Sequence, residues 1–179
     1  MTAQVLLVCG SRRSPSRTRS LVEHAAKQAD EMGLSTEVLD LREQSMELFD
    51  GRDPSAYDEP TRTAVQTFLD AELYLVASPV YFGGISGALK NLIDHVPYEQ
   101  FKDRSRTAGL VMTGRDRRHR QILDSQLRST FVYLDVTVPT TSVFATEDAF
   151  DGFTLTDPSI QNRMRTLLED TISIHEATS

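Results

Sequence analysis

The chain has 179 residues, the size of a single domain, and its 39% hydrophobic and 25% charged residues exclude disorder and repeat arrays. Its formal net charge of -7 argues against nucleic acid as the main partner, because phosphate backbones attract basic surfaces. No stretch reaches membrane-spanning length and no leader pattern precedes the first apolar run, so we expect a cytoplasmic protein without membrane contact. One cysteine, Cys9, and four histidines without ligand spacing lead us to expect no metal site.

The N-terminal segment predicts a strand, a basic loop and a helix. Residues 4–9 form a nearly continuous apolar run, which is typical of a strand buried on both faces of a parallel sheet. Residues 10–19, "GSRRSPSRTR", follow at once with four arginines and no acid. A helix is predicted from Thr18 to Met32, and Gly33 ends it.

The remaining chain repeats this alternation. Further strands are predicted at residues 35–41, 73–78, 107–113 and 136–145, the last with Pro139 marking a sheet edge or a bulge. Further helices are predicted at residues 61–71, 86–95 and 158–174, with another ending near Leu134 and a polar loop at 42–60. We therefore expect one α/β domain over residues 1–174 and a frayed tail at 175–179. Its fold class is a flavodoxin-like three-layer sandwich with a five-stranded parallel sheet in the order 2-1-3-4-5.

Ligands of such sheets bind beyond the carboxyl ends of the strands, where the strand order reverses between the first and third strands. This rule selects the loops at residues 10–18, 79–85 and 114–119. The first combines small hydroxyl residues with a helix N-terminus, whose free N–H groups and positive dipole end attract phosphate. It matches neither G-x-G-x-x-G nor G-x-x-x-x-G-K-[ST], which leaves a serine-rich loop that holds a phosphate monoester without metal. The alternative is a solvated loop whose hydroxyls only cap the helix.

The second loop places two aromatic residues among turn formers. Pro79, Gly83 and Gly84 hold the backbone open around Tyr81 and Phe82. This arrangement suits a flat heteroaromatic ring that is hydrogen-bonded by main-chain groups. In the alternative interpretation the aromatic residues belong to the core and the glycines only make the turn.

Two segments carry a family resemblance. "GSRRSPSRTRSL" at 10–21 and "SPVYFGGISGALKNLIDHVP" at 78–97 resemble the NADPH-dependent FMN reductase family, most closely its members that supply reduced flavin to sulfonate monooxygenases. The resemblance spans nearly the whole chain, and the pattern P-x-Y-x(5)-G-x-L-K-N-x-x-D is specific. It implies FMN as cofactor and NADPH or NADH as co-substrate. Because the flavin carries the redox chemistry, no catalytic side chain is expected.

The resemblance also implies which residues hold the flavin. The phosphate loop falls on Ser11, Arg13, Ser16 and Thr18, with Arg17 as an additional candidate. The flavin ring is bordered, chiefly by main-chain groups, at Pro79, Val80, Tyr81, Phe82 and Gly83. In the third loop Thr113, Gly114 and His119 match the family.

The third loop departs from the family at residues 115–118, where "RDRR" replaces a glycine and small residues. Three interpretations remain open. The loop is solvated; or Arg115, Arg117 or Arg118 receives the extra phosphate of NADPH; or the loop contacts an acidic partner or a neighbouring subunit. His119 either packs beside the flavin or lies on the surface.

The leading functional hypothesis is an NAD(P)H-dependent FMN reductase that passes hydride from the nicotinamide to FMN and then on to an acceptor. One alternative is a quinone or azo reductase that keeps FMN as a prosthetic group. Another is a non-enzymatic electron carrier of the flavodoxin type, against which the long loop and the Gly83–Gly84 turn argue, because they suggest space for a second ligand. The resemblance further implies a homodimer or homotetramer that uses the helix at 86–95, and a monooxygenase partner.

Overall fold

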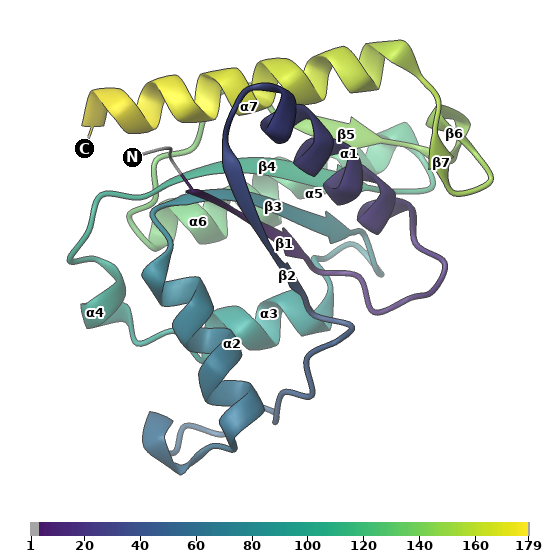
Figure 1. The fold of residues 1–179 in the computed structure, drawn as a ribbon. Coiled ribbons are helices and arrows are strands. Elements are labelled where there is room, and N and C mark those ends of the chain that lie inside the picture. Colours follow the sequence, from purple (N-terminus) through teal and green to yellow (C-terminus); the bar gives the residue numbers. More distant parts are fainter. Residues whose placement is uncertain (1–3, 179) are drawn as a thin grey trace.

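Five parallel strands form one sheet in the order β2-β1-β3-β4-β5 (Figure 1). They are β1 (Gln4–Cys9), β2 (Ser35–Asp40), β3 (Leu73–Pro79), β4 (Thr107–Thr113) and β5 (Val143–Ala145). The computed structural model of the chain describes residues 4–178. The predicted strand order and flavodoxin-like fold class are therefore confirmed.

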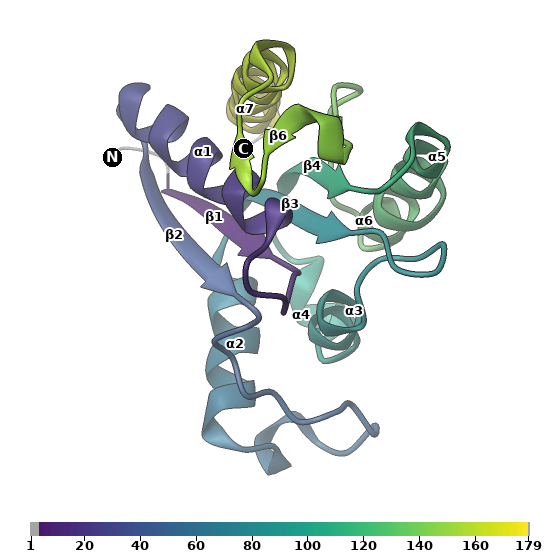
Figure 2. The ribbon, with the colours of Figure 1, turned by 90° about the vertical axis from the view of Figure 1, so that its right-hand side faces the viewer.

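Helices cover both faces of the sheet (Figure 2). One face carries α1 (Arg17–Glu31) and α7 (Pro158–Thr178). The other carries α2 (Glu59–Asp70), α3 (Gly87–Asp94), α4 (Tyr98–Phe101), α5 (Arg120–Ile122), the π-helical η3 (Leu123–Arg128) and α6 (Ser129–Tyr133). Short 3-10 helices lie in the loops: η1 (Pro54–Ala56), η2 (Arg117–His119) and η4 (Glu147–Ala149). Among residues 4–178 no helix is both long and apolar enough to span a membrane.

Two apolar layers, one on each side of the sheet, form the core. In β1 the side chains of Val5, Leu7 and Cys9 pack against α1, whereas Leu6 and Val8 pack on the opposite side. All seven residues of β3 and of β4 are buried, which explains their continuous apolar runs. Burial also raises the pKa of the Cys9 thiol, consistent with its role as a small core residue.

The predicted helices at 18–32, 61–71 and 86–95 are confirmed within two residues at each end. The fifth strand is shorter than predicted. Over residues 136–142 only one bridge, between Thr107 and Thr137, joins the chain to β4, and regular pairing begins at Val143. Pro139 has no N–H for a ladder, and its carbonyl instead accepts a hydrogen bond from Arg128 Nη1 at 2.7 Å.

The C-terminal region differs from the prediction in two places. Helix α7 continues past Ile174 to Thr178, whose hydroxyl donates to the Ile174 carbonyl at 2.9 Å; Ser179 lies outside the described residues. A hairpin of β6 (Phe150–Asp151) and β7 (Thr154–Leu155) precedes this helix. Its two-residue strands are too short to leave a periodic pattern in the sequence.

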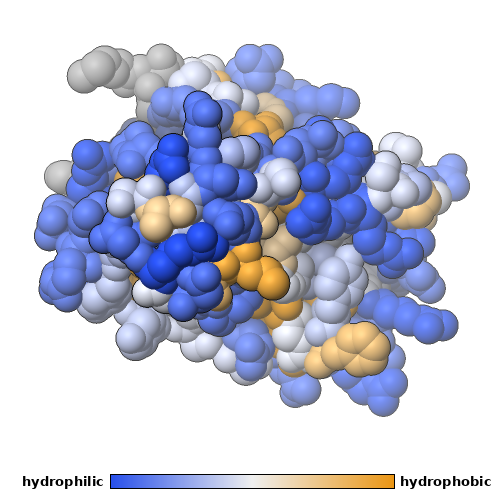
Figure 3. All heavy atoms as spheres, turned by 90° about the horizontal axis from the view of Figure 1, so that it is seen from below, coloured by the Kyte–Doolittle hydropathy of each residue, from blue (hydrophilic) through white to orange (hydrophobic). Residues whose placement is uncertain are grey.

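The surface on the side of α2, α3 and α4 is mainly hydrophilic, with scattered apolar patches (Figure 3). Large apolar side chains that are exposed include Leu48 at 79%, Phe49 at 46% and Tyr133 at 75%.

A buried arginine joins the second helical layer to the sheet. Arg106 is 2% exposed and stacks on the Phe101 ring at 4.1 Å. Its guanidinium donates to the carbonyls of Leu69 at 2.8 Å and Ala71 at 3.2 Å, and also to that of Phe101. Among the described residues no carboxylate forms an ion pair with it. Its charge is compensated by backbone carbonyls and by the Tyr74 hydroxyl, which accepts a hydrogen bond from Arg106 Nε at 3.1 Å.

Replacing Arg106 by methionine should lower the free energy of unfolding by about 3 kcal/mol, because several buried carbonyls lose their donor at once. Urea denaturation of R106M measures the loss. The matched control is R104M: the Arg104 side chain is 51% exposed and lies 3.8 Å from Glu72, so its change should cost less than about 0.5 kcal/mol. Equal losses in the two variants would contradict this assignment.

Candidate functional site

The loops that follow β1, β3 and β4 meet around a cavity of about 520 Å³. Ten of the thirteen residues predicted for the flavin line it: Ser11, Arg13, Ser16, Arg17, Thr18, Pro79, Val80, Tyr81, Thr113 and Gly114. Phe82, Gly83 and His119 do not line it. The structure therefore brings segments that are distant in sequence to one place, at the point where the strand order reverses.

The first loop offers hydrogen-bond donors to this cavity. Ser16 caps α1 and accepts the Arg19 N–H at 3.3 Å. The N–H groups of Arg17 and Thr18, in the first turn of α1, donate to no acceptor among the described residues. Free N–H groups at the positive end of a helix dipole favour an anion.

Two threonine hydroxyls fix the first loop to the third. Thr18 Oγ1 and Thr113 Oγ1 lie 2.7 Å apart and both residues are buried. One hydroxyl hydrogen is used in this contact, so the other remains available to a ligand in the cavity. The second loop is tied to the same strand end, because Val80 N–H donates to the Thr113 carbonyl at 2.8 Å.

Gly10 allows β1 to end directly beside β3. Its N–H donates to the Ala77 carbonyl at 2.8 Å. A Cβ at this position would lie 2.9 Å from that carbonyl oxygen and 3.1 Å from Ser86 Oγ. The glycine therefore permits a close approach of two strand ends, and the first loop begins at that point.

The arginines of residues 10–19 have different roles. Arg17 is held by Glu147 at 3.3 Å and by the Gly152 carbonyl at 3.3 Å. Arg19 pairs with the buried Asp40 and with Glu23, so it is not simply solvated. Among residues 4–178 the Arg13 guanidinium has no ion pair or hydrogen bond, although it lines the cavity. Arg13 is thus the arginine of this loop that a ligand can use.

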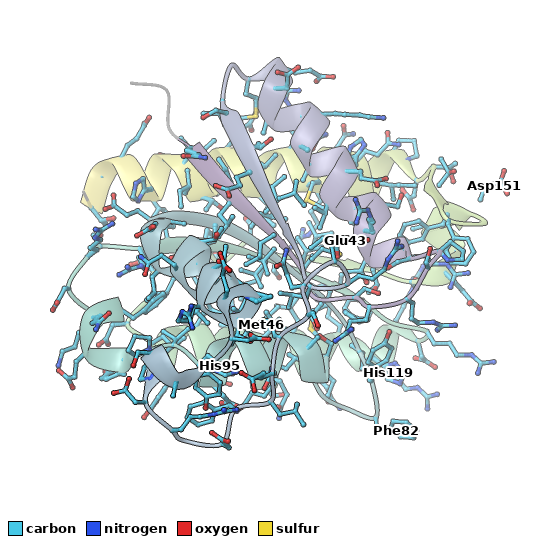
Figure 4. All side chains as sticks on the ribbon, turned by 60° about the horizontal axis from the view of Figure 1, so that its bottom comes forward. Glu43, Met46, Phe82, His95, His119 and Asp151 are labelled. Carbon is cyan, nitrogen blue, oxygen red and sulfur yellow. The ribbon has the colours of Figure 1, made fainter. Side chains whose placement is uncertain are left out.

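The second loop ends in a tight hairpin turn. Tyr81 and Gly84 exchange backbone hydrogen bonds of 3.0 Å, and Phe82 and Gly83 have φ values of +47° and +77°. This geometry is that of a type I′ turn, which favours glycine in its second position. It turns Phe82 outwards, fully exposed at the edge of the molecule (Figure 4). The part of the second loop that lines the cavity is therefore Pro79, Val80 and Tyr81.

The three arginines of the third loop differ in their ion pairs and in whether they line the cavity. Arg118 forms two hydrogen bonds with Asp116, at 3.1 and 2.8 Å, and these lower the pKa of the Asp116 carboxyl. Arg117 lies 3.5 Å from Asp148. Arg115 lines the cavity and has no ion pair among the described residues. Of the three, only Arg115 combines a place at the cavity with an uncompensated charge.

His119 lies behind the cavity wall. A Cβ at Gly114 would be 3.3 Å from the His119 Cβ and 2.6 Å from the Phe144 ring, so this glycine accommodates both side chains. The sequence analysis did not identify Pro15, Glu147 and Phe153 as lining residues. Glu147 and Phe153 come from the region of the β6–β7 hairpin, which the sequence did not reveal. No group of three or more metal-ligating side chains occurs within residues 4–178.

Comparison with known proteins agrees with this geometry. The family model described as NADPH-dependent FMN reductase matches residues 3–151. An NAD(P)H-dependent FAD/FMN reductase of Geobacillus thermodenitrificans is 29% identical over 163 residues, 89% of this chain and 87% of that protein. An NADH-dependent FMN reductase of Pseudomonas putida is 30% identical over 172 residues, 95% of this chain and 91% of that protein.

A solved oxidoreductase from Corynebacterium diphtheriae has the same fold, with a TM-score of 0.77 at 19% identity and coverage of 99% of both chains. Sheet order and cavity position together define a flavodoxin-like α/β protein with a cavity at the point where the strand order reverses. The chain belongs to the NADPH-dependent FMN reductase family and is an oxidoreductase with NAD(P)H-dependent FMN reductase activity.

Gly10→Ala should lower the free energy of unfolding by about 1–3 kcal/mol, because its methyl group meets a backbone oxygen that cannot yield easily. Thermal or urea unfolding measures the change. Gly87→Ala is the control: a Cβ there meets nothing within 4 Å, and alanine favours the helix, so stability should be unchanged or slightly higher. A Gly10→Ala protein as stable as Gly87→Ala would show that the strand ends are not tightly packed.

Proposed function

We propose that FMN binds in the three-loop cavity with its phosphate against residues 11–18 and its ring against Pro79, Val80 and Tyr81. The observation that carries this assignment is the convergence of the loops after β1, β3 and β4 on one cavity. The loop after β1 offers free N–H groups and Arg13, and the loop after β3 offers the uncharged residues Pro79, Val80 and Tyr81. The volume of about 520 Å³ is within the range of cofactor sites. The contact between Thr18 and Thr113 holds the start of α1 against the end of β4.

When bound, FMN accepts a hydride from the nicotinamide and passes the electrons to an acceptor. The chain itself contributes binding and orientation. Arg13 and the N–H groups of the first helical turn compensate the phosphate charge without a metal. Main-chain carbonyls of residues 79–81 and 113–114 would orient the ring, because the N–H groups of Val80, Tyr81 and Gly114 already donate to carbonyls of the protein. Tyr81, at 38% exposure, leaves one side of the cavity open to a second ligand.

Arg115 is the residue we assign to the nicotinamide co-substrate. It lies on the cavity wall, whereas Arg118 is neutralised by Asp116 and Arg117 faces Asp148. An arginine fork without a carboxylate partner suits a phosphate group. This assignment favours NADPH over NADH, because only NADPH carries the additional phosphate.

The proposal also includes how FMN is used, the oligomeric state of the enzyme and the protein that receives the reduced flavin. FMN acts as an exchangeable substrate in a cytoplasmic homo-oligomer, and reduced flavin passes to a monooxygenase. The exposed apolar side chains Leu48 and Phe49, next to α3, support a subunit interface on that side. The second candidate is a quinone or azo reductase with tightly held FMN, which the same cavity also accommodates.

Arg13→Ala should raise the dissociation constant of FMN about tenfold, because a charge-assisted contact to the phosphate is lost. Arg12→Ala is the matched control: Arg12 is the adjacent residue but does not line the cavity, so its change should leave the constant within about twofold. Titration with FMN, followed by flavin fluorescence, measures both. Equal effects of the two replacements would remove the phosphate assignment.

The same preparations test the reaction. NADPH or NADH oxidation that requires added FMN supports the exchangeable flavin, whereas bound flavin that turns over quinones supports the second candidate. Bound flavin that neither nucleotide reduces would overturn the proposed reductase.

Arg115→Ala should raise KM for NADPH about five- to tenfold with little change in kcat, because a ground-state contact to phosphate is removed. KM for NADH should change less than twofold. Arg118→Ala serves as the control, since Asp116 already compensates that guanidinium. Steady-state kinetics with each nucleotide give the answer, and a parallel rise of both KM values would argue that Arg115 acts on the flavin instead.

A further inference from the structure

The three-loop cavity contains an acidic side chain. Glu147 lines it, and no other aspartate or glutamate within residues 4–178 does. Three arginines line the same cavity, Arg13, Arg17 and Arg115. An acid is unexpected beside a proposed phosphate site, because a carboxylate repels a phosphate. The position of Glu147 therefore calls for a physical reason.

Glu147 makes one specific side-chain contact in the described part of the chain. It is the first residue of η4, which follows β5. Its Oε2 accepts a hydrogen bond from Arg17 Nη1 at 3.3 Å. With 56% of its side chain exposed, the carboxylate needs no partner to offset burial. The effect of Glu147 is therefore to be sought at the cavity and not in the core.

Arg17 is held on the side of the β6–β7 hairpin. Its Nε donates to the Gly152 carbonyl at 3.3 Å, and its guanidinium lies 5.5 Å from the centre of the Phe153 ring. Arg17 is also the first residue of α1, the helix whose free N–H groups are placed against the phosphate. An arginine at the proposed phosphate position thus has its charge compensated by the protein itself.

The ion pair affects ligand binding more than it affects stability. Both side chains are at least one-third exposed, and exposed ion pairs contribute little to the free energy of unfolding. A contact between a guanidinium and a phosphate is strong when the guanidinium has no other anionic partner. Glu147 removes that advantage from Arg17 and leaves it with Arg13 and Arg115.

We infer that the Glu147–Arg17 pair lowers the affinity of the cavity for FMN and thereby keeps the flavin exchangeable. Glu147 compensates a charge that the phosphate would otherwise use, and its carboxylate repels the phosphate as well. The inference rests on the proposed placement of the FMN phosphate against residues 11–18. It makes Glu147 the residue that sets whether the flavin leaves as a substrate or stays as a prosthetic group.

Glu147→Gln should lower the dissociation constant of FMN about five- to tenfold, because Arg17 is released and the repulsion is removed. Arg17→Gln should raise the constant about five- to tenfold, because it leaves the Glu147 carboxylate uncompensated in the cavity. Fluorescence titration with FMN measures both constants, and stopped-flow release of FMN should be slower from Glu147→Gln than from the wild-type protein.

Asp151→Asn is the matched control. It removes one negative charge from the β6–β7 hairpin, but Asp151 does not line the cavity and lies at the outer edge of the molecule (Figure 4). The dissociation constant of FMN should stay within about twofold of the wild-type value. Urea denaturation of each variant shows whether it is folded.

A purely structural role of the ion pair predicts a different result. If the pair only fixed the hairpin, replacing either partner would weaken FMN binding. Weaker binding in both variants, or an unchanged constant in Glu147→Gln, would therefore overturn the inference. Failure of the proposed function is distinguishable, because then the wild-type protein does not bind FMN or Arg13→Ala leaves its affinity unchanged.

Discussion

Strand β1 pairs with β2 on one side and with β3 on the other, and this arrangement makes the chain leave the sheet in opposite directions after neighbouring strands. The loops that follow them must diverge, and a crevice opens at their carboxyl ends. Gly10 lets the ends of β1 and β3 approach without a side chain between them. The Thr18–Thr113 contact then binds the first loop to the end of β4. The position of the site thus follows from the strand order, and its shape from a few short contacts.

The charge around the cavity differs from the net charge of the chain. The chain is acidic overall, yet ten residues after β1 hold four arginines and no acid. Most of the arginines around the site are neutralised by a specific carboxylate: Arg17 by Glu147, Arg19 by Asp40 and Arg118 by Asp116. These ion pairs fix the positions of the loops. Because the carboxylate cancels the charge of the guanidinium, they attract an anion only weakly. Among the arginines that line the cavity, Arg13 and Arg115 have no ion pair with a described residue, so the positive charge left uncompensated at the cavity is much smaller than the number of arginines suggests.

The sequence predicted helices and strands correctly where each extends over six or more consecutive residues with a regular apolar pattern. The buried strands read as apolar runs, and the helices as apolar residues at helical spacing, so β3, β4 and α1 were predicted nearly to the residue. It failed at the β6–β7 hairpin, where two-residue strands have no period, and at residues 136–142, where Pro139 interrupts the pairing. Which arginines pair with a carboxylate and which stay unpaired could not be predicted either. Glu147, for example, lies 130 positions from Arg17, and only the fold brings the two side chains together.

The specific pattern that carries the family resemblance has a structural part as well as a functional one. Its asparagine, Asn91, accepts the Phe49 N–H at 3.0 Å and donates to the Glu47 carbonyl at 2.8 Å. His95 donates to the same carbonyl at 3.0 Å and lies edge-on to the Tyr57 ring at 4.4 Å. These contacts order the long loop of residues 42–60 against α3, where Met46 packs on the apolar core (Figure 4). Part of the motif therefore fixes a loop beside the site, while Pro79 and Tyr81 face the cavity.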